Sequence, residues 1–333
     1  MSGRIALLAD IGGTHARFAL ADSGAAAPLR EDSVRQYEVA GFASLDVAAA
    51  HYLDHVGVPA GSVHDGVFAV AGRVDGDAAQ ITNHPWTISR SRSQSELGLD
   101  SLRLVNDFAA QAMAVELLGA RDLAPIGPHG PVAGGEERTC AVIGPGTGLG
   151  VSALIVREGR GHVLETEGGH VSFAATDALE AAVLERLTAR FGRVSNERLI
   201  SGAGLVNLYE ALAEIDGAPA VTMHPREVSA GAARGEPRCV RALDLFFAAF
   251  GAITGDLVLT LGAWDGVYLT GGLVPKLLGP LQQSRFRARF EDKGRFAAAM
   301  AKVPTLAVLH AQPGLLGAAA FARRDYVPEG DGA

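Results

Sequence analysis

Apolar positions open the chain as two short runs on either side of a polar turn. The first run ends at Asp10, the turn contains Gly12, Gly13 and Thr14, and the second run extends to Leu20. Short apolar runs bounded by Gly and Asp are typical of strands, and two such runs joined by a tight turn form a hairpin. The pattern therefore predicts a β-hairpin near the start of the sequence.

The same pattern recurs in the middle of the chain. An apolar run that starts at Cys140 meets a turn containing Gly146, Thr147 and Gly148, and a second run extends to Ile155. Glycines bring bare backbone N–H groups against an anion, and a threonine hydroxyl adds a donor. We therefore expect a duplicated chain whose two turns hold nucleotide phosphates, with an acidic residue of the first turn organising a divalent cation. Tight hairpins also favour Gly and Asp for conformational reasons, so a plain turn is the alternative for each.

Two common nucleotide-binding motifs do not fit the sequence. A dinucleotide-binding fingerprint runs from a strand directly into a helix, whereas the apolar run Val151–Ile155 predicts a second strand after the glycines. No Gly-x-x-x-x-Gly-Lys-Ser/Thr loop occurs either. These observations argue against a Rossmann site at this turn and against a P-loop enzyme.

Strands and helices alternate along the rest of the chain. Apolar runs predict further buried strands at Val67–Ala71, Leu102–Val105, Val267–Thr270 and Leu306–Leu309. The remaining pattern predicts helices after Asp107 through Leu118, over Asp177–Phe191 and Leu205–Ile215, and from Pro313 to about Arg323. The Pro- and Gly-rich stretch Pro125–Gly135 is the predicted linker between the halves. This alternation predicts α/β domains with largely parallel sheets, whose ligands bind at the carboxyl ends of strands.

Composition narrows the class further. The 333 residues are 48% hydrophobic and 20% charged, which allows a large core divided between two lobes. A net charge of -8 disfavours nucleic-acid and anionic-membrane surfaces, and two cysteines fit a reducing cytoplasm. The apolar segment Leu243–Trp264 is interrupted by Asp and Gly, which favours a buried core helix over a membrane span. The basic run Arg285–Arg295 contains acidic residues and predicts a solvated helix face.

Three segments carry candidate chemistry. Asp107 lies between a predicted strand and helix, which suits a general base, although Asn106–Asp107 would also serve as a helix N-cap. Glu167 and His170 flank two glycines whose turn would point both side chains outward, and a solvated loop is the alternative. Glu197 supplies another carboxylate, unless its segment only caps a helix. Carboxylates with an Asn and a His favour recognition of a polyhydroxylated ligand such as a sugar.

Eight motifs spread in order over essentially the whole chain resemble the bacterial glucokinase family. They are Asp10–Arg17, Leu104–Phe108, Gly146–Gly150, Glu167–Val171, Glu197–Gly202, Gly271–Pro275, Phe290–Phe296 and Pro313–Gly317. The resemblance implies a hexokinase-type, actin-like ATPase (ribonuclease H-like) α/β fold, with a mixed, largely parallel sheet flanked by helices in each lobe. It implies a small lobe at 1–116 plus 312–326, a large lobe at 117–311 and a frayed tail at 327–333, with a cleft that closes on sugar.

The resemblance also implies roles for individual residues. Asp107 would be the catalytic base, and the glucose ligands would be Asn106, Asp107, Glu167, His170 and Glu197. The phosphate turns would be Gly12, Gly13 and Thr14 with Gly146, Thr147 and Gly148, and the turn beside adenosine would be Gly271 and Gly272. Asp10 would hold Mg²⁺ through water. His15 stands where the family usually carries Asn, so the first turn is expected to be tuned differently, and the absence of a Cys-rich zinc motif separates the chain from the related repressor, open-reading-frame and kinase (ROK) group.

Together these roles predict a cytoplasmic, ATP-dependent glucokinase that makes glucose 6-phosphate for glycolysis. Its expected partners are glucose, ATP, Mg²⁺ and a second copy of the chain, with no nucleic acid and no membrane. A kinase for another hexose would use the same fold. An actin-like ATPase that forms polymers or acts as a chaperone would not need Glu167, His170 or Glu197, and a sugar-sensing regulator would need a DNA-binding module for which the short segment before the first strand leaves no room.

Overall fold

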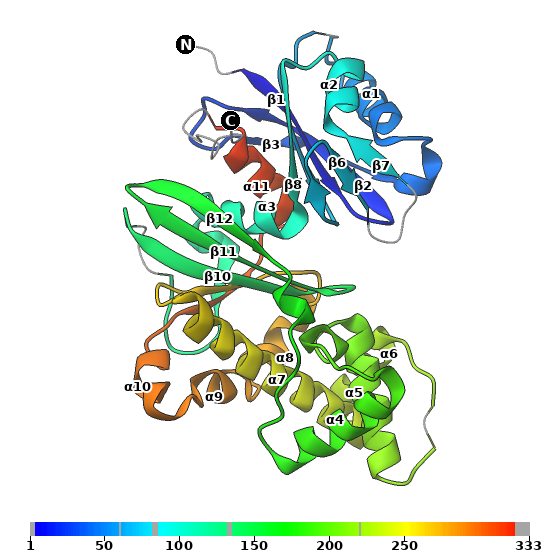
Figure 1. Ribbon diagram of the computed structural model, residues 1–333, viewed down its shortest axis with the longest axis vertical. Helices are drawn as coiled ribbons and strands as arrows, with labels where there is room; N and C mark the ends of the chain where they lie inside the picture. Colours follow the sequence, from blue (N-terminus) through cyan, green and yellow to red (C-terminus); the bar gives the residue numbers. More distant parts are fainter. Residues whose placement is uncertain (1–3, 60, 82–85, 132–134, 220, 324–333) are drawn as a thin grey trace. The chain divides into compact units, whose positions relative to one another are not determined.

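The chain divides into two compact units (Figure 1). The computed structural model describes residues 4–59, 61–81, 86–131, 135–219 and 221–323. Unit 1 comprises residues 1–119, 154–165 and 310–333, and unit 2 comprises residues 120–153 and 166–309. Each unit has its own hydrophobic core and all or most of one large sheet, so each is described by itself. The tail predicted at 327–333 lies outside the described residues.

Unit 1 is built on a five-stranded sheet with the order β3-β2-β1-β4-β8. Its strands are β1 (Ile5–Ile11), β2 (His15–Asp22), β3 (Leu29–Glu38), β4 (Asp65–Val70) and β8 (Ser101–Asn106). β1, β4 and β8 pair in parallel, whereas β2 pairs antiparallel with both of its neighbours, so the sheet is mixed. A small antiparallel sheet adds β5 (Val74–Asp75), β6 (Ala78–Gln80) and β7 (Thr87–Ser89). The parallel strands bring three carboxyl ends to one edge of the large sheet.

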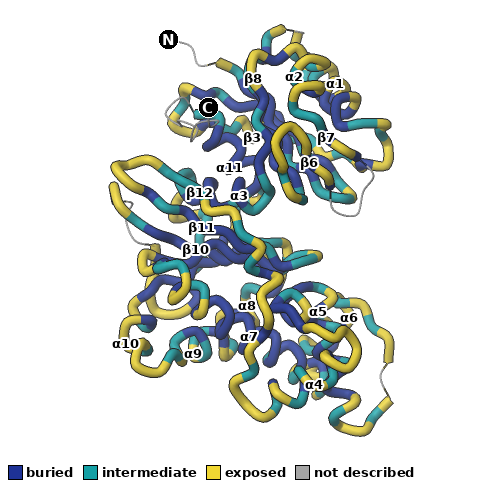
Figure 2. Tube along the Cα trace, viewed as in Figure 1, coloured by how far each residue is buried: buried dark blue, intermediate teal, exposed yellow. Residues whose placement is uncertain are grey.

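The helix closest to the C-terminus holds unit 1 together. The α-helices of the described part of this unit are α1 (Leu45–His55), α2 (Arg90–Glu96), α3 (Asp107–Met113) and α11 (Pro313–Phe321). α11 is buried along nearly its whole length and packs against α3, β1 and β4 (Figure 2). A Cβ added to Gly317 would lie 1.6 Å from the carbonyl oxygen of Ala110 in α3. Only glycine permits this approach, so α11 fixes the helix that starts at Asp107.

Unit 2 contains most of a six-stranded sheet with the order β12-β11-β10-β13-β14-β9. The strands are β9 (Leu123–Pro125), β10 (Arg138–Pro145), β11 (Leu149–Arg157), β12 (Arg160–Thr166), β13 (Val267–Leu269) and β14 (Thr305–Val308). β10, β13 and β14 are parallel, and β9 runs antiparallel at the edge. Residues 154–165, which include the end of β11 and most of β12, group with unit 1.

A long apolar helix forms the centre of unit 2. α7 (Pro237–Leu261) contacts β10 and is surrounded by α5 (Gly202–Ile215), α6 (Pro225–Ala233) and α9 (Phe286–Glu291). α4 (Ala178–Phe191) packs on α5, and α8 (Leu278–Gln282) and α10 (Ala297–Met300) are short. α7 is long and apolar enough to cross a membrane, but 78% of its most apolar window is buried in the protein. The prediction of a core helix in this segment is confirmed.

The solvated helix face predicted for Arg285–Arg295 is wrong for three of its five basic residues, whereas Arg285 and Arg295 are exposed as predicted. The side chains of Arg287, Arg289 and Lys293 are only 14%, 13% and 10% exposed. Arg287 donates hydrogen bonds to the backbone carbonyls of residues 300, 301 and 303, and Arg289 forms an ion pair with the buried Glu180 at 2.8 Å. These cations are buried because carbonyl and carboxylate partners from distant segments offset their loss of hydration.

Other predicted elements are confirmed with small shifts at their ends. The helix predicted from Asp107 through Leu118 stops earlier, at Met113, and a 3-10 turn, η2 (Ala114–Glu116), follows it. Helices commonly tighten into a 3-10 turn where they end. The linker predicted at Pro125–Gly135 is wrong as a boundary between the halves, because this stretch lies within residues 120–153 of unit 2. Pro125 is instead the last residue of edge strand β9, a position that tolerates the missing N–H of proline.

Candidate functional site

Two strand ends place acidic groups at the same edge of the unit 1 sheet. Asp10 lies opposite Ala69 of β4, and the next residue of β4, Val70, lies opposite Asn106. Asp107 follows as the first residue of α3. The parallel register therefore brings Asp10 and the Asn106–Asp107 pair to the carboxyl edge of one sheet, where ligands of open α/β sheets bind.

Asp10 is held between Arg17 and the start of α11. Its Oδ2 accepts a hydrogen bond from Arg17 Nη1 at 3.3 Å, and its side chain is 20% exposed. A Cβ added to Gly314 would lie 2.7 Å from the carboxyl carbon of Asp10, so glycine is needed at this point of α11. Burial raises the pKa of Asp10, while the charge of Arg17 and its hydrogen bond act in the opposite direction.

The N-cap of α3 is Asn106, not Asp107. Asn106 Oδ1 accepts hydrogen bonds from the backbone N–H groups of Phe108 at 2.8 Å and Ala109 at 3.2 Å. Its Nδ2 donates to the carbonyl of Gly72 at 3.1 Å. Asp107 Oδ1 accepts from the N–H of Phe108 at 3.0 Å. The capping role considered for this pair thus belongs to Asn106, and Asp107 stands one residue inside the helix.

A carboxylate that the sequence analysis did not single out lies beside this pair. Glu165, near the end of β12, accepts a hydrogen bond from the backbone N–H of Asn106. Partial burial raises the pKa of Glu165, and that hydrogen bond lowers it by a smaller amount. Nothing in the local sequence distinguishes Glu165 from its neighbour Glu167, because the contact depends on a long-range approach of β12 to the start of α3.

The first glycine-rich turn is a short loop between β1 and β2, as predicted. The Gly12 N–H donates to the carbonyl of His15 at 2.9 Å, and the Val39 N–H donates to the carbonyl of Thr14 at 3.0 Å. A Cβ added to Gly12 would meet nothing closer than the His15 oxygen at 3.5 Å. This turn, which also contains Gly13, therefore has room around Gly12.

The second glycine-rich turn connects β10 to β11 and is hydrogen-bonded to the start of α5. The Gly146 N–H donates to the carbonyl of Gly148 at 2.8 Å and closes the turn. The Gly202 N–H, at the start of α5, donates to the carbonyl of Gly146 at 2.9 Å. Thr147 at the tip is exposed. The predicted hairpin is confirmed, and its tip presents a hydroxyl beside backbone amides.

A third turn, which contains Gly271 and Gly272, packs its backbone against the second. A Cβ added to Gly271, which has a φ of +81°, would lie 2.6 Å from the carbonyl oxygen of Pro145. The Leu273 N–H donates to the same oxygen at 3.1 Å. A Cβ added to Gly144 would in turn lie 2.6 Å from the carbonyl carbon of residue 270. The two turns thus meet through backbone atoms, which requires glycine on both sides.

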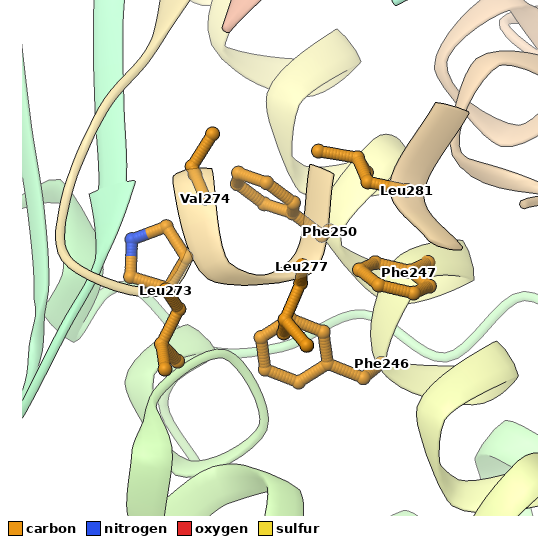
Figure 3. Close-up of a pocket in the computed structure, with 8 residues that line it drawn as sticks. Phe246, Phe247, Phe250, Leu273, Val274, Leu277 and Leu281 are labelled. Atoms are coloured by element: carbon orange, nitrogen blue, oxygen red, sulfur yellow. The ribbon is translucent and has the colours of Figure 1, made fainter. Parts of the chain in front are cut away.

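An apolar floor lies beneath these two turns. Its side chains surround a void of about 10 Å³ and come from the segment after the third turn and from α7 (Figure 3). They are Leu273, Val274, Leu277 and Leu281 after the third turn, Phe246, Phe247 and Phe250 of α7, and Pro145 at the end of β10. Close packing of this floor keeps the second and third turns in a fixed relation.

A larger cavity of about 430 Å³ lies next to this floor and shares Phe247 and Leu277 with it. Its walls come from α6, α7 and the segment that leads from the third turn into α8. Apolar side chains dominate the lining, and the polar ones are Ser229, Asp244, Lys276 and Ser284. Its volume falls in the range of small-molecule sites, about 300 to 1,000 Å³.

Glu167 and His170 project from a single turn of unit 2. Residues Gly168–His170 form a 3-10 helix, η4, and the side chains of Glu167 and His170 are 76% and 58% exposed. Glu167 Oε2 lies 4.0 Å from His170 Nε2. Arg193 Nη2 donates to the carbonyl of His170 at 2.5 Å and holds the backbone of the turn. The prediction that both side chains point outward is confirmed.

Glu197 lies on a neighbouring 3-10 helix, η5 (Asn196–Arg198). The two turns lie side by side because the Asn196 N–H donates to the carbonyl of Val171 at 2.8 Å. Glu197 Oε2 accepts a hydrogen bond from the Leu149 N–H at 2.9 Å, directly after the second glycine-rich turn. The cap of the following helix α5 is Ser201, so Glu197 is not used as a cap.

The candidate residues thus fall into two groups. Unit 1 holds Asp10, the first turn and the Asn106–Asp107 pair, and unit 2 holds the second and third turns with Glu167, His170 and Glu197. Within each unit the structure brings together residues that are far apart in the sequence.

Comparison with known proteins places this arrangement in a family. The sequence model described as Glucokinase matches residues 7–325. The chain is 58% identical over 323 residues to a glucokinase of Stenotrophomonas maltophilia, with 96% of each chain covered. It is also 34% identical to a solved glucokinase structure from an Antarctic psychrotroph, with a TM-score of 0.85 over 95% of this chain and 98% of the other. The chain belongs to the glucokinase family, as its motifs predict.

A more distant structure shares the fold. The ROK family glucokinase from Streptomyces griseus, solved in complex with glucose and AMPPNP, is 19% identical and superposes with a TM-score of 0.62 over 95% of this chain and 98% of that one. The α/β architecture of mixed sheets flanked by helices is therefore common to both proteins.

Proposed function

We propose that this chain is an ATP-dependent glucokinase, which transfers the γ-phosphoryl group of MgATP to the 6-hydroxyl of glucose and supplies glucose 6-phosphate to glycolysis. The identity of 58% to a glucokinase over almost the whole length supports this reaction. The observation that carries the proposal is the group formed by Glu167, His170 and Glu197 beside the second glycine-rich turn. Groups that bind hydroxyls next to a turn that binds phosphate are what a sugar kinase requires.

Sugar recognition is assigned to Asn106, Asp107, Glu167, His170 and Glu197. The carboxylates accept hydrogen bonds from sugar hydroxyls, and His170 adds a ring nitrogen. Asn106 uses its Oδ1 for the helix cap and one Nδ2 proton for Gly72, which leaves the other Nδ2 proton to donate to a hydroxyl. A site of this kind discriminates against a sugar that lacks a hydroxyl, because its polar groups would remain unpaired.

Asp107 is the proposed general base. It occupies the first position of α3, where the helix dipole favours a negative charge, and the Phe108 N–H orients its Oδ1. The carboxylate accepts the proton of the sugar 6-hydroxyl as the bond from that oxygen to the γ-phosphorus forms and the bond to the departing ADP oxygen breaks. Because the transition state of phosphoryl transfer is loose, positioning contributes more than the strength of the base.

The proposed phosphate site is formed by both hairpin turns, Gly12, Gly13 and Thr14 with Gly146, Thr147 and Gly148, in which the Gly12 and Gly146 N–H groups close the turns and the threonine hydroxyls and other N–H groups would face phosphate. Kinase sites bind Mg²⁺ through one or two carboxylates and the phosphate oxygens, and Asp10 fits that role, through water, at the sheet edge that also carries Asp107. Bound Mg²⁺ neutralises charge on the phosphate oxygens. Gly271 and Gly272 would border the adenosine.

The cavity of about 430 Å³ is the proposed place for the adenine ring. Its apolar lining suits the flat faces of the base, and its few polar side chains suit the edge. It lies next to the apolar floor that supports the second and third turns, so a nucleotide whose phosphates reach the second turn would have its base in this part of unit 2.

The proposal includes the actin-like ATPase fold of the family, in which a small lobe (1–116 plus 312–326) and a large lobe (117–311) close on sugar. The division of Asp107 and Glu167 between units 1 and 2 supports this, because both units are then needed for catalysis. Closure would exclude water that competes with the sugar hydroxyl. The family resemblance extends the proposal to a cytoplasmic homodimer.

The function is tested by direct detection of sugar 6-phosphates after incubation with MgATP and, separately, glucose, mannose, fructose and galactose. We expect product from glucose far in excess of the others, and at least about 100-fold slower formation of product by the Asp107→Asn variant. Product from a different hexose would keep the mechanism and change the substrate. Absence of product from every hexose would overturn the proposed function.

A further inference from the structure

The residue directly after the second glycine-rich turn is contacted by both proposed sugar-binding motifs. The backbone N–H of Leu149 donates to Glu197 Oε2 at 2.9 Å. The carbonyl oxygen of Leu149 lies against Gly169, where an added Cβ would come within 1.9 Å of it. Gly169 lies between Glu167 and His170 in η4. One peptide segment of β11 is therefore held between the two motifs.

The turn itself is shaped by the same carboxylate. A Cβ added to Gly148 would lie 2.5 Å from Glu197 Oε2, so the carboxylate occupies the space that a side chain at position 148 would need. On the other flank, the Gly202 N–H donates to the carbonyl of Gly146 at 2.9 Å. Ser201 Oγ donates to the carbonyl of Glu197 at 2.8 Å and joins the two contacts. Residues 197–202 thus contact the turn at both of its ends.

We propose that Glu197 is a positioning residue for the phosphate turn as well as a sugar ligand, and that occupation of the sugar site thereby raises the affinity for the nucleotide. This inference rests on the proposed function. Glu197 commits Oε2 to Leu149 and has further lone pairs for a sugar hydroxyl. A sugar hydroxyl bound there holds the carboxylate in the orientation that braces Gly148 and Leu149, and therefore fixes the turn in the shape that binds phosphate.

The test measures AMPPNP affinity by isothermal titration calorimetry with Mg²⁺, first without sugar and then with saturating glucose. Without sugar, a residue that only binds sugar has no effect. With glucose, AMPPNP binding to wild type should tighten by about 5-fold or more, and an unchanged affinity would overturn the link between the two sites. Without sugar, we expect Glu197→Ala to weaken AMPPNP binding by about 5-fold or more, because the Leu149 N–H loses its charged hydrogen-bond partner.

The matched control is Glu167→Ala, which removes a carboxylate from the neighbouring motif. The carboxylate of Glu167 is not the acceptor of the Leu149 N–H, which donates to Glu197. Glu167→Ala should leave AMPPNP affinity within about twofold of wild type.

A conservative variant separates the brace from the charge. Glu197→Gln keeps an oxygen that can accept the Leu149 N–H, so it should restore AMPPNP affinity to within about twofold of wild type while glucose binding stays weakened. Gly148→Ala disturbs the same contact from the turn and leaves the residue at position 197 unchanged. Its methyl group must displace the carboxylate, so it should weaken both glucose and AMPPNP, and unchanged affinity for both ligands would contradict the proposal.

Different results would overturn the proposed function and the role of Glu197 as a brace of the phosphate turn. Wild-type protein that binds neither glucose nor AMPPNP would overturn the proposed function. Wild-type protein that binds both, with the same AMPPNP affinity in wild type, Glu197→Ala and Glu167→Ala, would overturn the brace alone.

Discussion

The two units carry their acidic groups in different ways. In unit 1, Asp10 stands near the end of a buried strand, where its side chain is 20% exposed, and Asp107 starts a helix that is packed under α11. In unit 2, Glu167 precedes a 3-10 turn and is 76% exposed, and Glu197 lies in the 3-10 turn beside it. Groups on strands and helices are placed more precisely than groups on loops. On the proposed function, unit 1 fixes the groups of the chemical step, whereas unit 2 presents Glu167 on an exposed turn that can adapt to the sugar and holds Glu197 through the Leu149 N–H.

The glycine-rich turns of the two units also differ in how much space surrounds their glycines. Gly12 has space around it, whereas Gly148 lies against Glu197 and Gly271 lies against Pro145. In the first turn the space around Gly12 is open, whereas in the second and third turns glycine permits close contacts within the protein. Substitutions with opposite expected consequences can therefore separate the two kinds of turn.

The largest effect is expected at Asp107. Asp107→Asn keeps the size of the side chain but removes the proton acceptor, so kcat should fall by about 10²- to 10⁴-fold, the usual contribution of a general base. Initial rates of glucose 6-phosphate formation at saturating glucose and MgATP measure this. Turnover within a few-fold of wild type would refute the assignment of Asp107 to chemistry.

The Asp10→Asn variant should have a lower kcat but a higher Tm than wild type. Losing a carboxylate that organises the cation should cost roughly 10² in kcat, comparable with the loss of one preorganised electrostatic group. The Tm at pH 7 should nevertheless rise, because burial raises the pKa of Asp10 and its ionised form is therefore unfavourable in the folded protein. Kinetics and thermal unfolding of the same preparation test both halves, and a lower Tm would contradict the second.

The pH dependence follows from the same pKa shift. A raised folded-state pKa means that the folded protein binds this proton more tightly than the unfolded chain does. The contribution of Asp10 to stability is then fully present below its ordinary pKa of 3.8 and is lost as the pH rises through the raised value. Activity should change in the opposite sense and fall as the pH drops through that value. Stability curves of wild type and Asp10→Asn should converge below pH 3.8, and curves that diverge there would contradict the assignment.

Gly317→Ala tests the packing that fixes unit 1. The added methyl would lie 1.6 Å from a backbone oxygen of α3, which cannot move aside as a flexible side chain would. We expect destabilisation of about 1 to 3 kcal/mol, typical of an overpacked core, measured by denaturant unfolding. Gly279→Ala in α8 is the control, because a Cβ there meets nothing within 4 Å. Equal stability of the two variants would show that α11 does not constrain α3.

The smallest effect is expected at Gly12. The nearest atom to an added Cβ is at 3.5 Å, an ordinary contact, so Gly12→Ala should change the free energy of unfolding by no more than about 0.5 kcal/mol. Denaturant unfolding checks this. A loss comparable with that of Gly317→Ala would show that the first turn has no room around Gly12.

Local pattern was enough to predict the hairpins, the alternation of strands and helices and the core helix, because periodicity and glycine placement act over short distances. Contacts between distant segments were not predictable. Asn106 and Asp107 are both good caps, and only the folded backbone selects Asn106. Burial of Arg289 depends on Glu180, more than a hundred residues away, and the hydrogen bond to Glu165 depends on the course of β12. The roles of the site residues came from the family resemblance and stay predictions.

The division of labour between the units is tested most directly by the affinity for glucose without nucleotide, measured by isothermal titration calorimetry on Asp107→Asn and Glu167→Ala. The account predicts that Asp107→Asn, which keeps an oxygen that can accept the sugar hydrogen bond, binds glucose within about threefold of wild type, whereas Glu167→Ala keeps no acceptor and loses about 10-fold or more. A large loss in Asp107→Asn with unchanged binding in Glu167→Ala would contradict it.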